Sequence, residues 1–156
     1  MTSQIKFKKG TYKFHTNPNF NYQLNRTYAW SNGDLEELKT VAAKITDAAT
    51  WEKELLELAE KALQEKRMEN AIAYYRMAEF FMYDGHHAKI TTYDKAVNLF
   101  YDYHADLFKS GMIKRDLVPF GAATFLCYIR FPKTVNLRIP FCSMADMILI
   151  WKNLYQ

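Results

Sequence analysis

A change of hydrophobic period at Gly111 constrains the fold of this chain more than any other feature. Before it, apolar residues recur at the spacing of amphipathic helices, and after it they form short runs rich in β-branched and aromatic residues. The sequence therefore predicts a mainly α protein with a short β-hairpin. Its 156 residues, 49% hydrophobic and 24% charged, are enough for a globular core without disulfides or metal.

About four helices are predicted before Gly111. Asp34 has the side chain of a good N-cap, and Glu37 stands three residues later, as in a capping box. The expected helices cover Leu35–Ile45, a segment capped by Thr50, a segment from Met68 to a stop at Asp84-Gly85, and Ala88–Phe108 with Tyr93, Ala96, Val97, Phe100, His104 and Phe108 facing inward.

The third of these segments has the most specific pattern, because paired aromatics make part of it apolar nearly all round. Such a helix must be covered on two sides. Arg76 and Glu79 stand one turn apart and can form an ion pair. Core packing explains these residues, and the lining of an aromatic pocket is the alternative. The substrate-pocket candidates are Tyr74, Tyr75, Arg76, Glu79 and Phe80.

Two strands are predicted after Gly111, over Met112–Pro119 and Ala123–Phe131, with Pro132 closing the second. An isolated hairpin is marginally stable and leaves strand edges open, so we expect the chain to be weakly stable and to self-associate. The final stretch, Met144–Tyr155, has a passable pattern for a closing helix.

The opening residues 1–33 combine lysines and aromatic residues and contain no acidic residue. Alternation of basic and aromatic side chains can bind single-stranded nucleic acid. Because the cations are scattered and several asparagines break the run, the sequence favours an extended arm whose aromatics pack on the domain while its lysines stay in water. Nucleic-acid binding is therefore a minor alternative.

Several kinds of site are missing from the sequence. There is no G-x-S-x-G elbow, H-E-x-x-H helix, P-loop or dinucleotide loop, so neither catalytic residues nor a cofactor can be named. Ser110-Gly111 lacks the preceding glycine of an elbow, and Cys127 is expected in the core of a strand. His86-His87 has no carboxylate or cysteine at a ligand spacing, which favours a solvated turn over a metal site.

The composition suits a cytoplasmic protein. The two cysteines, Cys127 and Cys142, are too few for a disulfide scaffold. No apolar run approaches the length of a membrane span, and the first residues lack the apolar core of a secretory signal. The net charge of +4 does not by itself indicate a nucleic-acid partner.

Three segments resemble a known family. They are Leu58–Ala62, Ala73–Met82 followed by Lys89 and Tyr93, and Val118–Gly121 before a strand ending at Pro132. Over roughly Asn17–Pro132, the chain resembles the N-terminal helical cap of bacterial α/β-hydrolases of the dihydroxypseudooxynicotine hydrolase and fermentation-respiration switch group.

The resemblance implies four regions: a basic aromatic arm over 1–33, a helical cap over 34–110, a hairpin opening the hydrolase sheet over 111–133, and a divergent tail over 134–156. In that family the helices form a lid over the active site, and full-length relatives hydrolyse ester or carbon–carbon bonds of small molecules. This chain contains no serine elbow or triad, so it is expected to be inactive alone. A protein-interaction module with an aromatic groove around Tyr75, Phe81 and Phe100 is the alternative.

The tail departs from the family in an informative way. When Cys142–Leu154 is back-translated and read from each third codon base, one permitted reading is Leu-His-Gly-Gly-Tyr-Asp-Ser-Tyr-Met-Glu-Glu-Phe, which matches the family's oxyanion loop. Met144-Ala145 forces glycine, Met147-Ile148 forces aspartate and Trp151-Lys152 forces glutamate. We therefore expect a one-base frameshift upstream of Cys142, with an authentic C-terminal helix as the rival.

Overall fold

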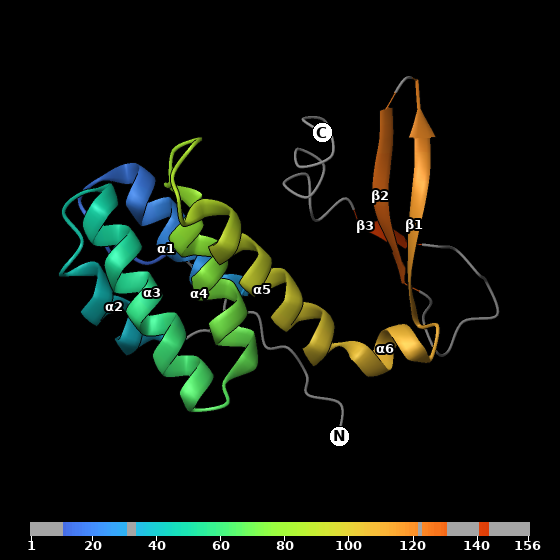
Figure 1. Ribbon diagram of the computed structural model, residues 1–156. Helices are drawn as coiled ribbons and strands as arrows, with labels where there is room; N and C mark the ends of the chain where they lie inside the picture. Colours follow the sequence, from blue (N-terminus) through green and yellow to red (C-terminus); the bar gives the residue numbers. More distant parts are fainter. Residues whose placement is uncertain (1–10, 31–33, 122, 131–140, 144–156) are drawn as a thin grey trace. The chain divides into compact units, whose positions relative to one another are not determined.

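The computed structural model describes residues 11–30, 34–121, 123–130 and 141–143 (Figure 1). The chain divides into two compact units, Met1–Tyr103 and His104–Gln156. The first is helical and the second holds a short helix and a sheet, so the prediction of a mainly α chain with a β-hairpin is confirmed. The elements are α1 (Pro18–Trp30), α2 (Leu35–Ala42), α3 (Ala48–Gln64), α4 (Met68–Phe80), α5 (Lys89–Tyr103), α6 (Ala105–Lys109), β1 (Ile113–Phe120), β2 (Ala123–Arg130) and β3 (Phe141–Ser143).

Helix α4 packs against α1, α3 and α5 (Figure 1). Its Ala71, Tyr74 and Ala78 are fully buried, and Tyr75 is only 1% exposed. Burial on several sides is what the aromatic pairs of this helix predict, because an all-round apolar helix is stable only when neighbours remove each face from water.

The core of the helical unit is built around Trp51 of α3. Its ring stacks on Phe20 at 5.4 Å and meets Phe81 edge-on at 4.9 Å. The indole Nε1–H donates to the carbonyl oxygen of Met77 over 2.7 Å, which satisfies the one polar group of a fully buried side chain. Trp51 thereby joins α1, α3 and α4.

The expectation of an extended arm over residues 1–33 is wrong for Pro18–Trp30, which forms α1. Asn17 supplies the cap: its Oδ1 accepts from the backbone N–H groups of Asn19 at 2.9 Å and Phe20 at 3.4 Å. Pro18 occupies the first helical position, where its missing N–H costs nothing. The asparagines that seemed to interrupt the segment start a helix instead.

The residues before α1 lie along it, held by two further asparagines. Asn21 Oδ1 accepts from the backbone N–H of Phe14 at 2.8 Å, and Asn25 exchanges hydrogen bonds of 2.7 and 2.9 Å with the backbone of Tyr12. The Tyr12 ring packs edge-on against Tyr28 at 5.1 Å. The predicted packing of the aromatics is confirmed for these residues, whereas Tyr22 is 62% exposed.

Two helix starts test the capping predictions. Asp34 caps α2 as expected, accepting from the N–H groups of Glu36 and Glu37. The cap of α3 is Asp47 and not Thr50. The Asp47 carboxylate accepts from the Thr50 N–H at 2.8 Å, and Thr50 Oγ1 accepts from the Asp47 N–H at 3.0 Å. Thr50 is therefore the third residue of α3, the N3 position of a capping box whose N-cap is Asp47.

The single helix predicted over Ala88–Phe108 is wrong, because α5 ends at Tyr103 and α6 begins at Ala105. His104 leaves the helical region at φ −100° and ψ 13°. The residues before it are aromatic or aspartate, which have low intrinsic helix propensity. Of the positions predicted to face inward, Tyr93 and Ala96 are buried, and Val97, Phe100, His104 and Phe108 are half-buried.

The second unit contains an antiparallel sheet in the order β1-β2-β3. β1 pairs with β2 from Ile113 opposite Arg130 to Phe120 opposite Ala123, which confirms the predicted hairpin to within one residue at each end. Gly121 in the turn has φ +58°, a conformation that glycine adopts without strain. The short β3 pairs with the far end of β2, with Ser143 opposite Tyr128, and was not predicted.

Some predictions fall outside the described residues. These are the lysines before position 11, the closing role of Pro132, and the rival accounts of 144–156 as a helix or as a frameshifted tail. Within the described ranges, none of the helices has both the length and the apolar character needed to cross a bilayer.

Candidate functional site

The five substrate-pocket candidates lie on α4, and the structure separates them by exposure. Tyr74, Tyr75 and Glu79 are buried, while Arg76 and Phe80 are half-buried. A side chain enclosed by protein cannot reach a ligand on the surface. The three buried residues therefore belong to the interior of the helical unit, and Arg76 and Phe80 are the members that reach solvent.

A carboxylate that the sequence singled out only as a capping residue organises one end of α4. Glu37 of α2 accepts from Arg67 Nη1 and Nη2 at 3.0 and 2.9 Å, from the Tyr74 hydroxyl at 2.9 Å and from Lys61 Nζ at 3.2 Å. Its side chain is 11% exposed. Glu37 thus joins α2 to the α3–α4 connection and to α4, and does not complete the capping box expected of it.

The ionisation of this cluster follows from its contacts. Burial alone would raise the pKa of Glu37, but the hydrogen bonds from Arg67, Tyr74 and Lys61 outweigh burial and hold the pKa below its ordinary value. Burial, with the negative charge of Glu37 beside it, raises the pKa of Tyr74 to about 12. At neutral pH the cluster therefore holds a charged carboxylate and a neutral phenol.

The predicted pair of Arg76 and Glu79 is confirmed. Arg76 Nη1 donates to Glu79 Oε1, and the Glu79 side chain is 5% exposed. The guanidinium carbon lies 4.7 Å from the ring centroid of Tyr93, in a cation–π arrangement that links α4 to α5. A buried carboxylate is tolerated here because a cation pairs with it.

Tyr75 lies beside a second ion pair, which the sequence did not indicate. Lys95 Nζ is 4.5 Å from the Tyr75 ring centroid and donates to Glu60 Oε1 over 2.5 Å. None of the described residues meets hydrogen-bond geometry with the buried Tyr75 hydroxyl. Burial raises the pKa of Tyr75. Since Tyr75 is enclosed, an exposed aromatic patch cannot include it, contrary to the expectation for an interaction groove.

Phe80 is the aromatic candidate nearest to solvent, and Arg26 of α1 lies over it. The Arg26 guanidinium carbon is 5.7 Å from the Phe80 ring centroid and 5.9 Å from that of Tyr22. Arg26 Nη1 donates to Gln23 Oε1 over 2.8 Å. Arg26 of α1 thus lies over Phe80, and Arg76 of α4 lies over Tyr93.

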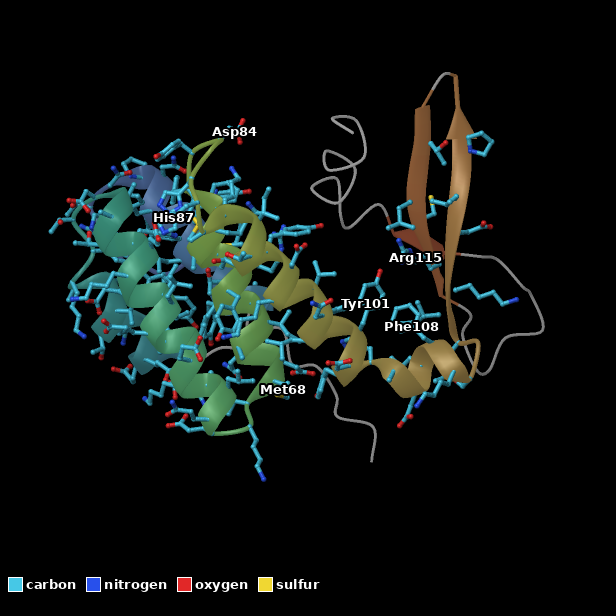
Figure 2. All side chains as sticks on the ribbon, viewed as in Figure 1. Met68, Asp84, His87, Tyr101, Phe108 and Arg115 are labelled. Carbon is cyan, nitrogen blue, oxygen red and sulfur yellow. The ribbon has the colours of Figure 1, made fainter. Side chains whose placement is uncertain are left out.

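The α4–α5 connection carries the two histidines, and Figure 2 labels Asp84 and His87 there. Glu52 of α3, which is far from the histidines in the sequence, brings its Oε2 to 3.3 Å from His86 Nε2. His86 Nδ1 accepts from the Ala88 N–H, and its ring stacks on that of His87. Over the described ranges, no group of three possible ligands could hold a metal.

Ser110 lies at the C-terminal end of α6. Its hydroxyl donates to the backbone carbonyl of Leu107 at 3.1 Å, at the end of α6. Cys127 is a half-buried residue of β2. Of the polar groups on α4, Tyr74 bonds to Glu37 of α2, and Arg76 pairs with Glu79 on the same helix, so these groups stabilise and position the helices.

Comparisons with protein-family models, with curated proteins and with solved structures found no match to this chain.

Proposed function

We propose that this chain is the lid region and the opening strands of an α/β-fold serine hydrolase acting on small molecules in the cytoplasm, and that it is inactive alone. The observation that carries the proposal is the order of its parts. A helical unit whose α4 bears the resembling motif is followed by an antiparallel strand pair, in which Val118–Phe120 end β1 and Gly121 lies in the turn. The resemblance assigns these two parts to a lid and to the start of a hydrolase sheet.

The contacts of α4 support a structural role for most of the candidate residues. A lid must keep water from the reacting groups, which requires a well-packed inner layer. Tyr74 is buried and donates a hydrogen bond to Glu37 of α2, and the buried Glu79 pairs with Arg76 of the same helix. In this proposal they hold the lid together, and the half-buried Arg76 and Phe80 are the residues that meet substrate.

The test compares two proteins in a short-chain ester assay. One is the chain as given, and the other is translated from the same gene with one base shifted after the codon for Asn136. We expect background turnover from the first and clear turnover from the second, abolished when the serine of a downstream G-x-S-x-G elbow is changed to alanine. Turnover by the given chain that disappears in Ser110→Ala would contradict the proposal.

A further inference from the structure

Two asparagines of α1 bind the backbone of another part of the chain. Asn21 and Asn25 stand four residues apart and therefore share one face of the helix. The Asn25 amide contacts one residue at two points: its Oδ1 accepts from the Tyr12 N–H at 2.7 Å, and its Nδ2 donates to the Tyr12 carbonyl at 2.9 Å. Asn21 Oδ1 accepts from the N–H groups of Phe14 at 2.8 Å and His15 at 3.1 Å. This face of α1 therefore recognises a polypeptide backbone.

The spacing of the two asparagines matches that of an extended chain. Four residues of an α-helix advance about 6 Å, and two residues of an extended chain advance about 6.6 Å. Tyr12 lies at Asn25 and Phe14 at Asn21, so the segment runs antiparallel to α1 with every second residue at an asparagine. Lys13, between the two anchored residues, is exposed.

Aromatic contacts select the side chains at the two anchored positions. The Tyr12 ring centroid lies 5.1 Å from that of Tyr28 and 5.8 Å from that of Phe14. Tyr12 and Phe14 are half-buried and pack on the core of the helical unit. His15 Nε2 donates to the Ile45 carbonyl over 2.9 Å, because a carbonyl oxygen only accepts. The matching ligand has two aromatic side chains two residues apart, followed by a hydrogen-bond donor.

We propose that this face of α1 is a binding site for an extended peptide segment of another protein molecule, with aromatic side chains two residues apart. We name it the asparagine clamp, defined by Asn21, Asn25 and Tyr28. In the structure Tyr12–His15 occupies the clamp as a tethered ligand, and the incoming segment takes its place. Backbone hydrogen bonds supply the affinity and aromatic contacts the selectivity, as in other modes of peptide recognition. The proposal does not depend on the assignment as a hydrolase lid.

The tethered segment is placed to leave without opening the core. Its side chains are exposed or half-buried. When it leaves, Phe20 keeps its ring contacts with Trp51 and Phe81, which are 5.4 and 5.3 Å away. A short tether holds a ligand at an effective concentration on the order of millimolar. A second segment therefore binds tightly only where the tethered one is weakened.

The first test measures fluorescence anisotropy of a labelled peptide with the sequence of Thr11–Asn17. The vacated chain is the full chain with Tyr12→Ala and Phe14→Ala. Because its tethered ligand is weakened, we expect it to bind the peptide at least about tenfold more tightly than the native chain does. Equal binding by the two chains, or no binding by the vacated chain, would overturn the proposal.

Two further variants of the vacated chain locate the bound peptide. Asn25→Leu removes the two-point contact and should weaken binding at least about tenfold. Asn19→Leu is the matched control, because Asn19 is an exposed asparagine of α1 that contributes only its backbone N–H to the helix cap; we expect a change within about twofold. Equal weakening by both variants would refute the clamp.

The peptide itself carries a second control. N-methylation at Tyr12 removes the N–H that donates to Asn25 Oδ1, whereas N-methylation at Lys13 changes a residue between the two anchored positions. We expect the first to weaken binding to the vacated chain at least about tenfold and the second to change it by less than about threefold. Equal effects would contradict backbone recognition by Asn25.

The last test uses the native chain and does not depend on any variant folding. Amide hydrogen exchange separates local opening from global unfolding. If the segment leaves the clamp by itself, the amide hydrogens of Tyr12 and Phe14 should exchange at least about a hundredfold faster than that of Leu55 in the buried face of α3. Exchange as slow as at Leu55 would show that the segment leaves only on global unfolding and would overturn the proposal.

Discussion

Replacing Glu37 by glutamine removes the charge on which four hydrogen bonds converge, from Arg67, Tyr74 and Lys61. The Glu37 side chain is 11% and that of Arg67 30% exposed, so water replaces only part of what is lost. Hydrogen bonds to a charged group contribute roughly 1.5–3 kcal/mol each, and breaking a buried pair costs roughly 3–5 kcal/mol. Because Arg67 is partly solvated and retains Glu65, we expect a loss of about 3 kcal/mol.

The assay is urea unfolding followed by far-UV circular dichroism, which reports the helical unit. Glu36→Gln is the matched control: Glu36 is the preceding residue on α2, its side chain is 78% exposed, and it pairs only with nearby Lys39 among the contacts described. That pair is expected to contribute less than about 0.5 kcal/mol. If Glu37→Gln costs no more than Glu36→Gln, the Glu37 cluster does not hold the helices together.

The pH dependence of the same pair of proteins adds a second readout. The pKa of Glu37 lies below its ordinary value of 4.5 in the folded chain. The carboxylate therefore contributes its full stabilisation above about pH 4.5 and loses it as the pH falls through the folded pKa. We expect the stability difference between the native chain and Glu37→Gln to shrink in acid. A difference that grows below pH 4.5 would contradict this assignment.

Four further variants test other contacts. The pKa of Tyr74 is raised from 10.0 to about 12, so about 3 kcal/mol of stability present below pH 10 is lost as the pH rises towards 12. Between pH 9 and pH 11, the urea midpoint of Tyr74→Phe should therefore fall less than that of the native chain. Trp51→Phe leaves the Met77 carbonyl without its 2.7 Å donor and should cost about 1–3 kcal/mol; an unchanged midpoint would refute the role of that bond. Glu79→Gln should lower the free energy of unfolding by roughly 3–5 kcal/mol, because it leaves Arg76 without its charged partner. Replacing Arg76 by methionine and Glu79 by leucine together should leave the free energy of unfolding nearly unchanged. Equal losses of stability in both proteins would argue against a purely structural pair.

The sequence predicted what depends on local patterning. Hydrophobic spacing located α2, α3 and α4 and merged α5 and α6 into one helix, and β-branched and aromatic runs located both strands of the hairpin. The ion pair of Arg76 and Glu79 was predictable because residues three apart share a helix face. The same kind of reasoning failed for α1, because Asn17, Asn21 and Asn25 were interpreted as breaks when they cap and hold a helix.

Contacts between distant segments were not predictable in this way. Tyr74 meets Glu37 across 37 positions and Lys95 meets Glu60 across 35, and no local spacing relates such pairs. The approach of Glu52 to His86 likewise depends on how α3 packs beside the α4–α5 connection. Of the candidate residues on α4, the sequence identified the right helix but could not show which side chains the neighbouring helices enclose.

The most direct test of the central claim is the coding DNA downstream of the codon for Asn136. If these helices and strands are the lid and first strands of a serine hydrolase, the shifted frame should encode Leu-His-Gly-Gly-Tyr-Asp and continue to a G-x-S-x-G elbow. Codons that spell an unrelated sequence in that frame would contradict the account.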